Sequence, residues 1–135
     1  YGVLVDIATK VMRGEAIAVD MGYVNVIWQG DANRIALEAL ARAAIPPLVI
    51  NLTGSERLSV RTLADRFAKR LGVEAKFSGV EKTDALLSNT TRLRSLFTAP
   101  ETSVETMIDL VADWVEADGP LLGKPTKFEA RDGKF

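Results

Sequence analysis

Residues 24–44 constrain the fold more than any other part of this sequence, because a strand pattern is followed directly by a helix pattern. Residues 24–28 are mostly β-branched or aromatic, which is typical of a short strand. The run then breaks, and Asp31 can cap a following helix by accepting hydrogen bonds from its free backbone N–H groups. Pro46-Pro47 ends the helix, and a second apolar run follows at residues 48–52. This order predicts a βαβ unit with two parallel strands buried on both faces.

Further elements are expected to flank this unit. They are helices over residues 1–13, 60–71 and 103–117, a short helix ending at residue 97, and a third strand over residues 73–78. Ser59 is expected to cap the second long helix and Gly72 to end it. Thr102 and Glu105 form a capping-box pattern before the last helix, in which Trp114 is expected in the core. The predicted fold class is α/β, with a small, mainly parallel sheet and flanking helices.

Length and charge limit the classes of protein that this chain can belong to. At 135 residues it fits one domain, assigned to residues 1–120, followed by an irregular C-terminal tail over residues 121–135. The net charge of −1 gives no electrostatic footprint for nucleic acid or an anionic membrane surface. No apolar run approaches the ~20 residues of a membrane span. We therefore expect no nucleic-acid partner, no membrane partner and a cytoplasmic location.

The residues needed for common catalytic chemistry are missing. The chain contains no Cys and no His, which removes thiolate nucleophiles and the commonest general base and metal ligand. Its glycines form neither a G-x-G-x-x-G fingerprint nor a P-loop. Neither Tyr1 nor Tyr23 is followed four residues later by Lys, since those positions hold Val5 and Ile27. We expect no catalytic residue, no cofactor-binding residue and no metal site in this chain.

Three segments carry a resemblance to a known family. Residues 50–72 read INLTGSERLSVRTLADRFAKRLG, and residues 86–100 read LLSNTTRLRSLFTAP and precede the predicted helix over 103–117. Asp31 lies between a predicted strand and a predicted helix. In order and spacing, these segments resemble the C-terminal, substrate-binding part of the extended short-chain dehydrogenases/reductases, which include the NAD-dependent epimerases and dehydratases. The resemblance covers residues 1 to about 118.

The resemblance implies a lobe that is catalytically incomplete by itself. It implies that a Rossmann domain of the same chain precedes Tyr1 and holds NAD or NADP, and that this domain carries the catalytic Tyr and Lys. It also implies a small-molecule substrate such as a sugar derivative. Members that bind sugar nucleotides have an Arg before the central strand, where this chain reads Met21-Gly22-Tyr23. A bidentate guanidinium is hard to replace at a phosphate, so this departure argues against a nucleotide-diphosphate sugar.

Six residues are predicted to line the substrate cleft: Tyr23, Asn25, Trp28, Gln29, Thr53 and Arg92. Trp28, Gln29 and Thr53 fall at the carboxyl ends of the predicted parallel strands, where open α/β sheets place their ligands, and Tyr23 and Asn25 could face the same cleft. Arg92 would bind an anionic group of the substrate. Each residue also has an ordinary structural interpretation, as a packed strand residue, a turn residue or, for Arg92, part of a solvated helix face.

A different class of function fits the same sequence, namely a stand-alone, non-enzymatic interaction or regulatory α/β domain. The two interpretations differ in what they predict for the surface. A missing domain would leave apolar surface exposed on the helix over residues 1–13 and at the sheet edge. The chain is then expected either to form a homodimer through that surface or to show an unusually large exposed apolar patch.

Overall fold

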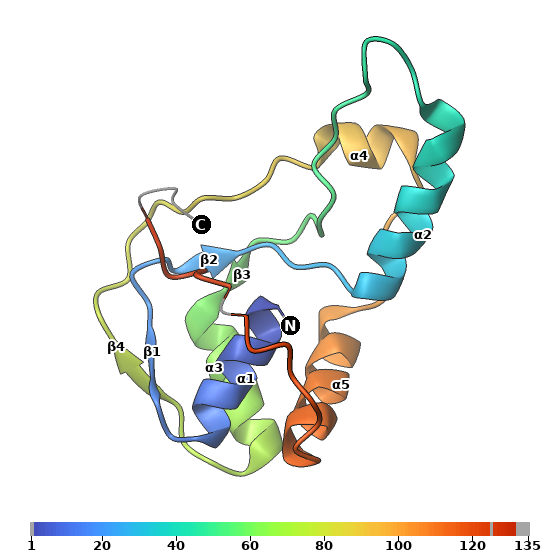
Figure 1. Ribbon diagram of the computed structural model, residues 1–135. Helices are drawn as coiled ribbons and strands as arrows, with labels where there is room; N and C mark the ends of the chain where they lie inside the picture. The colour runs from blue at the N-terminus through green and yellow to red at the C-terminus, as the bar shows by residue number, and fades with distance from the viewer. Residues whose placement is uncertain (1, 125, 132–135) are drawn as a thin grey trace.

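Three long helices pack together in the computed structural model, which describes residues 2–124 and 126–131 (Figure 1). The elements are α1 (Val3–Met12), β1 (Ala16–Ala18), β2 (Tyr23–Val24), α2 (Gln29–Ala39), the 3₁₀-helix η1 (Leu40–Arg42), β3 (Leu58–Ser59), α3 (Val60–Leu71), β4 (Lys76–Ser78), α4 (Thr91–Leu96) and α5 (Val104–Glu116). Helix α1 packs against both α3 and α5, which also contact each other. These bounds confirm the expected helices. Tyr1, which was expected to begin the first helix, lies outside the described residues. The class is mixed α/β.

Helix α3 supplies the centre of the core. Its N-cap Ser59 accepts a hydrogen bond from the backbone N–H of Thr62 at 3.2 Å, and Gly72 ends it in the left-handed conformation at φ 68°. Both were predicted, and both are confirmed. Phe67 is fully buried and belongs to the same core cluster as Ile7 and Val11 of α1. Burial of an apolar side chain of this size contributes roughly 1.5–3 kcal/mol, so this face holds the three helices together.

Helix α5 begins one residue later than the capping-box pattern predicted. Its N-cap is Ser103, whose Oγ accepts from the backbone N–H of Thr106 at 3.1 Å. Thr102 lies one residue before the cap, and its backbone N–H donates to the Asp31 carboxylate at 3.0 Å. The expectation for Trp114 is also wrong, since this residue is 48% exposed and its Nε1 donates to the carbonyl of Pro120.

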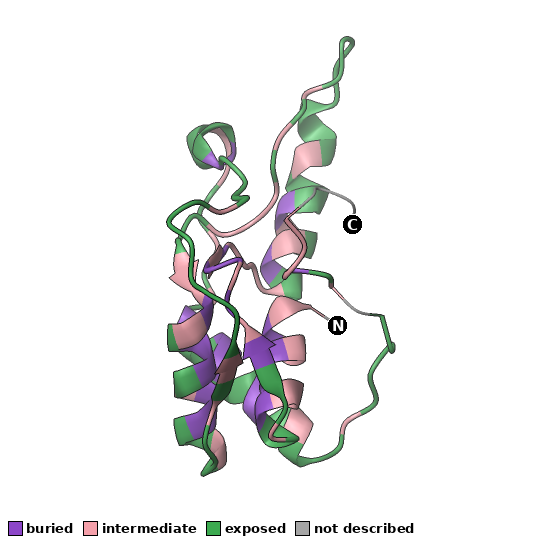
Figure 2. Ribbon diagram, turned by 90° about the vertical axis from the view of Figure 1, so that its left-hand side faces the viewer, coloured by how far each residue is buried: buried purple, intermediate pink, exposed green. Residues whose placement is uncertain are grey.

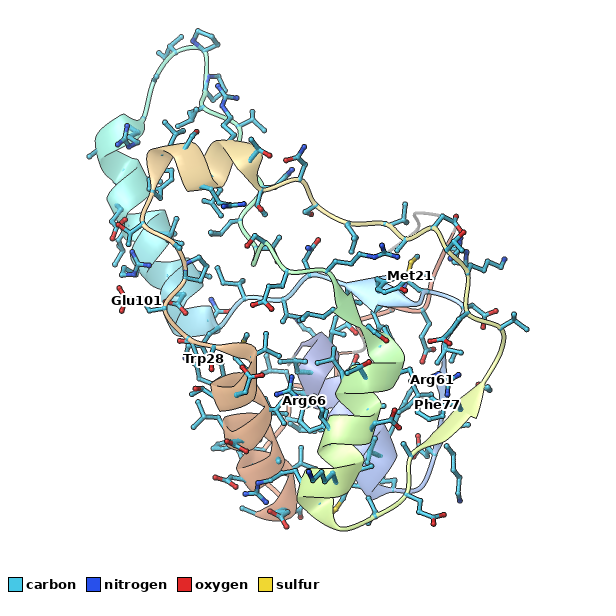
Figure 3. All side chains as sticks on the ribbon, turned by 180° about the vertical axis from the view of Figure 1, so that it is seen from behind. Met21, Trp28, Arg61, Arg66, Phe77 and Glu101 are labelled. Atoms are coloured by element: carbon cyan, nitrogen blue, oxygen red, sulfur yellow. The ribbon has the colours of Figure 1, made fainter. Side chains whose placement is uncertain are left out.

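The strands form two separate pairs, and the predicted βαβ unit is wrong. Strand β1 pairs in parallel with β4, and β2 pairs antiparallel with β3, so that Val24 lies opposite Leu58. The second strand of the predicted unit, over residues 48–52, is not a strand in the structure. The antiparallel β3 takes the place beside β2. The predicted strand over 73–78 is confirmed for its last three residues, and Arg61 of α3 lies over the ring of Phe77 in β4 at 4.1 Å (Figure 3).

An arm extends from the three-helix body, formed by α2, η1, segment 43–52 and α4 (Figure 1). Its parts are linked by side chains: Asn51 donates to the carbonyl of Asn89 at 2.9 Å, and Arg34 of α2 donates to the carbonyl of Ala99 at 3.1 Å. Most of the arm is exposed, in contrast to the purple interior of the body (Figure 2). Large apolar side chains are exposed along it, at Leu37, Leu40, Ile45 and Val49.

The C-terminal segment returns across the body without forming a helix or strand in its described residues, 121–124 and 126–131. Its Phe128 is buried and belongs to the core cluster that α1 contributes to. The face of α1 is therefore covered by α3, α5 and this segment. The expected exposed apolar surface on the helix over residues 1–13 is wrong, and the exposed apolar surface lies on the arm instead. Residues 125 and 132–135 of the predicted tail lie outside the described residues.

Candidate functional site

A cavity of about 190 Å³ opens where β2 ends and brings together Tyr23, Asn25 and Thr53, three of the six predicted substrate residues. The rest of its lining comes from segments far apart in the sequence: Val3, Met21, Val24, Leu86, Ser88, Thr126, Phe128 and Ala130. We call it the β2 pocket. The prediction for these three residues assumed a parallel sheet. Their convergence instead follows from the antiparallel pairing of β2 with β3.

The backbone around Gly54 positions Thr53 at this pocket. The N–H of Gly54 donates to the carbonyl of Val26 at 3.1 Å, which brings the loop before β3 against the chain leaving β2. A side chain at position 54 would collide with that same carbonyl oxygen, so the close approach requires glycine. Directly before β3, the Arg57 guanidinium lies 3.6 Å from the centre of the Tyr23 ring. This stacking fixes the orientation of the tyrosine.

The three pocket residues have different roles. Asn25 donates to the carbonyl of Glu56 at 3.1 Å and accepts from the N–H of Ser88 at 2.8 Å, so both ends of its amide join two loops of the pocket wall. Asn25 is thus a positioning residue. Within residues 2–124 and 126–131, the hydroxyls of Tyr23 and Thr53 make no hydrogen bond. These two hydroxyls are therefore available to a ligand.

The other three predicted residues lie away from the pocket and have structural contacts. Trp28 is the N-cap residue of α2 and packs against the core cluster. Gln29 is the first residue of α2 and donates to the side chain of Asn33 at 2.8 Å. Arg92 of α4 donates to the carbonyl of Val49 at 3.1 Å and so links two parts of the arm. For these residues the ordinary structural interpretation accounts for the observed contacts.

Asp31 joins the arm to α5, and its predicted role as the cap of α2 is wrong. It lies in the first turn of the helix, and its two carboxylate oxygens accept from the backbone N–H groups of Glu101 and Thr102 at 3.1 and 3.0 Å. Trp28 and Glu101 mark this junction in Figure 3. Burial by itself raises the pKa of Asp31, but the two N–H donors and the Arg34 guanidinium 3.9 Å away outweigh it, so the net shift is downward.

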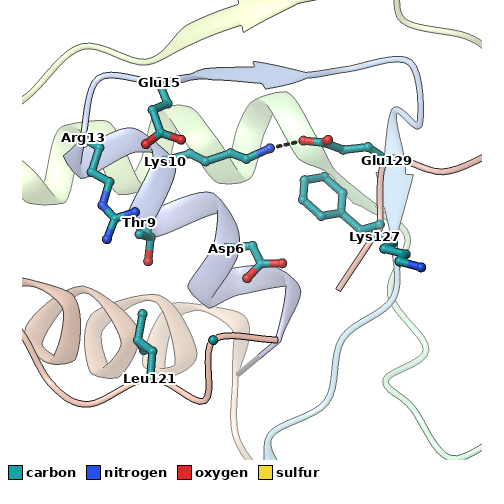
Figure 4. A pocket seen from close by; sticks show the side chains of 10 residues that line it. Asp6, Thr9, Lys10, Arg13, Glu15, Leu121, Lys127 and Glu129 are labelled. Atoms are coloured by element: carbon teal, nitrogen blue, oxygen red, sulfur yellow. Dashed lines mark hydrogen bonds and ion pairs between the residues drawn. The ribbon is translucent and has the colours of Figure 1, made fainter. Parts of the chain in front are cut away.

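A larger cavity of about 540 Å³ lies between α1 and the C-terminal segment (Figure 4). Lys10 of α1 forms an ion pair with Glu129 across it, and the Lys10 ammonium also lies 5.8 Å from the centre of the Phe128 ring. Asp6 lies at its edge and accepts from the backbone N–H of Thr126 at 3.0 Å and from the hydroxyl of the same residue. We call it the α1 cavity. Sequence reasoning missed it because the tail has no periodicity from which contacts could be predicted.

The described residues contain no cluster of three His, Cys, Asp or Glu that could hold a metal ion. None of the helices in this part of the chain has the length and hydropathy needed to cross a membrane. Comparisons with family models, with curated proteins and with solved structures find no match for this chain. The site is therefore interpreted from its own geometry.

Proposed function

We propose that this chain is the substrate-binding lobe of an NAD(P)-dependent epimerase, dehydratase or reductase of the extended short-chain dehydrogenase/reductase type. The observation that carries the proposal is the β2 pocket, where Tyr23 and Thr53 offer hydroxyls to a ligand. Its volume of about 190 Å³ is below the roughly 300–1,000 Å³ of most small-molecule pockets. Such a pocket suits one part of a substrate, such as a sugar derivative, whose remainder contacts another domain.

The dinucleotide would be held by that other domain. Helices α2 and α3 follow strands, as the helix of a dinucleotide-binding unit does, but their N-caps are Trp28 and Ser59. Neither junction has the run of glycines that lets backbone N–H groups approach a pyrophosphate. These residues do not fit a dinucleotide, and no reaction step is assigned to them. The lobe's contribution would be orientation of the substrate.

The arm is the surface that we assign to the missing Rossmann domain. Segment 48–52 alternates half-buried and exposed residues in the manner of a strand, yet within the described residues it makes no backbone-to-backbone hydrogen bond. Unpaired strand-like backbone is a template for strand addition to another sheet. The exposed Leu37 of α2 and Leu40 of η1 would pack against the same partner. A cytoplasmic location belongs to this proposal.

Hydrogen exchange and calorimetry test the proposal together. The longest reading frame that contains this chain is expressed beside the 135-residue chain, and both are titrated with NAD⁺ and with NADP⁺. We expect only the longer protein to bind, and its amides at 48–52 to exchange at least tenfold more slowly than in the short chain. Binding of either dinucleotide by the short chain, or equally fast exchange at 48–52 in both proteins, would contradict the proposal.

A matched pair of substitutions sharpens this test. Val49 of the arm and Val80 of the loop after β4 are similarly exposed, at 70% and 73%. Val49→Pro removes an N–H from the strand that we expect to be added, so it should weaken dinucleotide binding by the longer protein. Val80→Pro, which removes an N–H that lies 3.4 Å from the Asp20 carboxylate of the body, should not weaken that binding.

The second candidate function is a non-enzymatic interaction domain, favoured by the same exposed apolar side chains of the arm. It predicts a start codon immediately before Tyr1 and self-association through the arm. Sedimentation of the 135-residue chain and of its Leu37→Ser, Leu40→Ser variant separates the two proposals. A homodimer that this variant dissociates, together with no upstream coding sequence, would favour the second.

A further inference from the structure

The C-terminal segment 126–131 contributes to the walls of both the β2 pocket and the α1 cavity. Phe128 lines both, Thr126 and Ala130 line the first, and Lys127 and Glu129 line the second. Phe128 is thus a partition between two cavities of about 190 and 540 Å³, and it is only 8% exposed. The two volumes together fall inside the roughly 300–1,000 Å³ of typical small-molecule pockets, whereas the β2 pocket alone does not.

This segment is attached to the body mainly through side chains. Its one backbone-to-backbone hydrogen bond among the described residues is internal, from the N–H of Ala130 to the carbonyl of Lys127. The attachments are Asp6 with Thr126, Lys10 with Glu129, and Arg131 with the side chain of Asp84 at 2.5 Å and the carbonyl of Asp20 at 2.7 Å.

Such attachments are individually weak. Partly exposed ion pairs contribute little and are screened by salt, while a strand ladder would hold the segment much more firmly. Lys127 also adopts a positive φ of 52°, which is unfavourable for a residue with a side chain. The buried ring of Phe128 is therefore the principal contact that keeps the segment in place.

We infer that segment 126–131 is a displaceable lid, held in place mainly by the ring of Phe128. Displacement of this lid joins the two cavities into one ligand-sized pocket. The inference rests on the proposed function, because the β2 pocket is the substrate pocket of that proposal. The inference adds to that proposal a lid that controls entry of the substrate into the β2 pocket. The lid opens when its side-chain attachments are lost and the Phe128 ring leaves the core cluster, and this opening requires no unfolding of the three-helix body.

The absence of cysteine from the chain permits a direct test by thiol labelling. Val24 lines the β2 pocket and Val111 belongs to the core without lining either cavity, and both are 6% exposed. Val24→Cys reports opening of the lid, and Val111→Cys reports unfolding of the body. The rate of reaction of each variant with 5,5′-dithiobis(2-nitrobenzoate) is then measured in the 135-residue chain and in the longer protein, alone and with lid substitutions.

Glu129→Gln keeps the shape of the lid and removes its ion pair with Lys10, so it tests opening without creating a hole. We expect it to raise the labelling rate of Cys at 24 by about twofold, which is the scale of one exposed ion pair. Phe128→Ala should raise this rate by about tenfold or more. The labelling rate of Cys at 111 should stay unchanged in both.

Sodium chloride at about 1 M should act like Glu129→Gln on the labelling rate of Cys at 24, because it screens the same attachments. An unchanged rate for Cys at 24 in Glu129→Gln and at high salt would overturn the lid. Equal increases for Cys at 24 and at 111 would also overturn it, because they would indicate unfolding of the body. No dinucleotide enters this measurement, so failure of the lid is distinguishable from failure of the proposed function.

Discussion

Replacement of Asp31 tests how the arm is joined to the body. Its carboxylate accepts from two backbone N–H groups, those of Glu101 and Thr102, and these are the described hydrogen bonds from the base of α2 to the segment that leads into α5. A hydrogen bond to a charged group contributes about 1.5–3 kcal/mol when it is buried. The two donors are only partly buried, so we expect Asp31→Ala to lower the free energy of unfolding by about 2 kcal/mol in total.

Urea unfolding followed by circular dichroism measures this change, and a thermal scan should show a midpoint lowered by roughly 7 °C for a domain of this length. The matched control is Asp65→Ala, since Asp65 is an exposed residue of α3 without an ion pair among the described residues. The control should change the free energy of unfolding by less than about 0.5 kcal/mol. A similarly small effect of Asp31→Ala would refute the assignment of Asp31 as the junction.

The pH dependence of the free energy of unfolding separates the effect of the Asp31 charge from the effect of its side-chain shape. The pKa of this carboxyl lies below its ordinary value of 3.8 in the folded chain, so its charge stabilises the fold fully above that value. This stabilisation is lost as the pH falls through the lowered, folded-state pKa. Asp31→Asn cannot titrate, so the difference in free energy of unfolding between it and the native chain should shrink below about pH 4. A difference independent of pH would contradict the charge argument.

Three further substitutions test the core, a cap and the arm. Phe67→Ala should lower the free energy of unfolding by about 3–5 kcal/mol in urea titrations, because Phe67 is fully buried among α1, α3 and α5. Ser59→Ala removes the N-cap of α3 and should lower the free energy of unfolding by about 1 kcal/mol in the same assay. Ser59→Asp keeps a capping oxygen and should retain most of that stability. Leu37→Ser combined with Leu40→Ser should change the free energy of unfolding by less than about 0.5 kcal/mol, since both side chains are about 70% exposed; a larger loss would place them in the core.

The sequence predicted α3 to the residue because its signals are local. Ser59 satisfies an N–H group three residues away, and Gly72 adopts a left-handed conformation that needs no distant partner. Asp31 carries an equally good capping signal, but its carboxylate is used seventy residues away in sequence, at Glu101. Capping preferences indicate that an oxygen will accept N–H groups at the start of a helix. They do not indicate which residues will supply these N–H groups.

Three of the six predicted substrate residues line the β2 pocket, and the reason is again that their sequence signals are local. Tyr23 and Thr53 meet because β2 and the loop before β3 converge at Gly54, and the sequence marks both places through a strand run and a Thr-Gly pair. Phe128 was missed because nothing local in residues 121–135 indicates that an aromatic ring will fill the partition between two cavities.

The failure at residues 48–52 is the most informative of these differences. Their composition predicts a buried strand, while on the exposed arm they make no backbone-to-backbone hydrogen bond within the described residues. Strand propensity expresses how well side chains suit a pleated, half-buried surface, and it is realised only where a neighbouring strand is present. The other two predicted strands find partners in part: of residues 24–28 only Val24 is paired, and of residues 73–78 only the last three are. A strand pattern that finds no strand partner over its whole length supports the proposal that its neighbouring strand belongs to another domain, and hydrogen exchange at 48–52 tests that proposal.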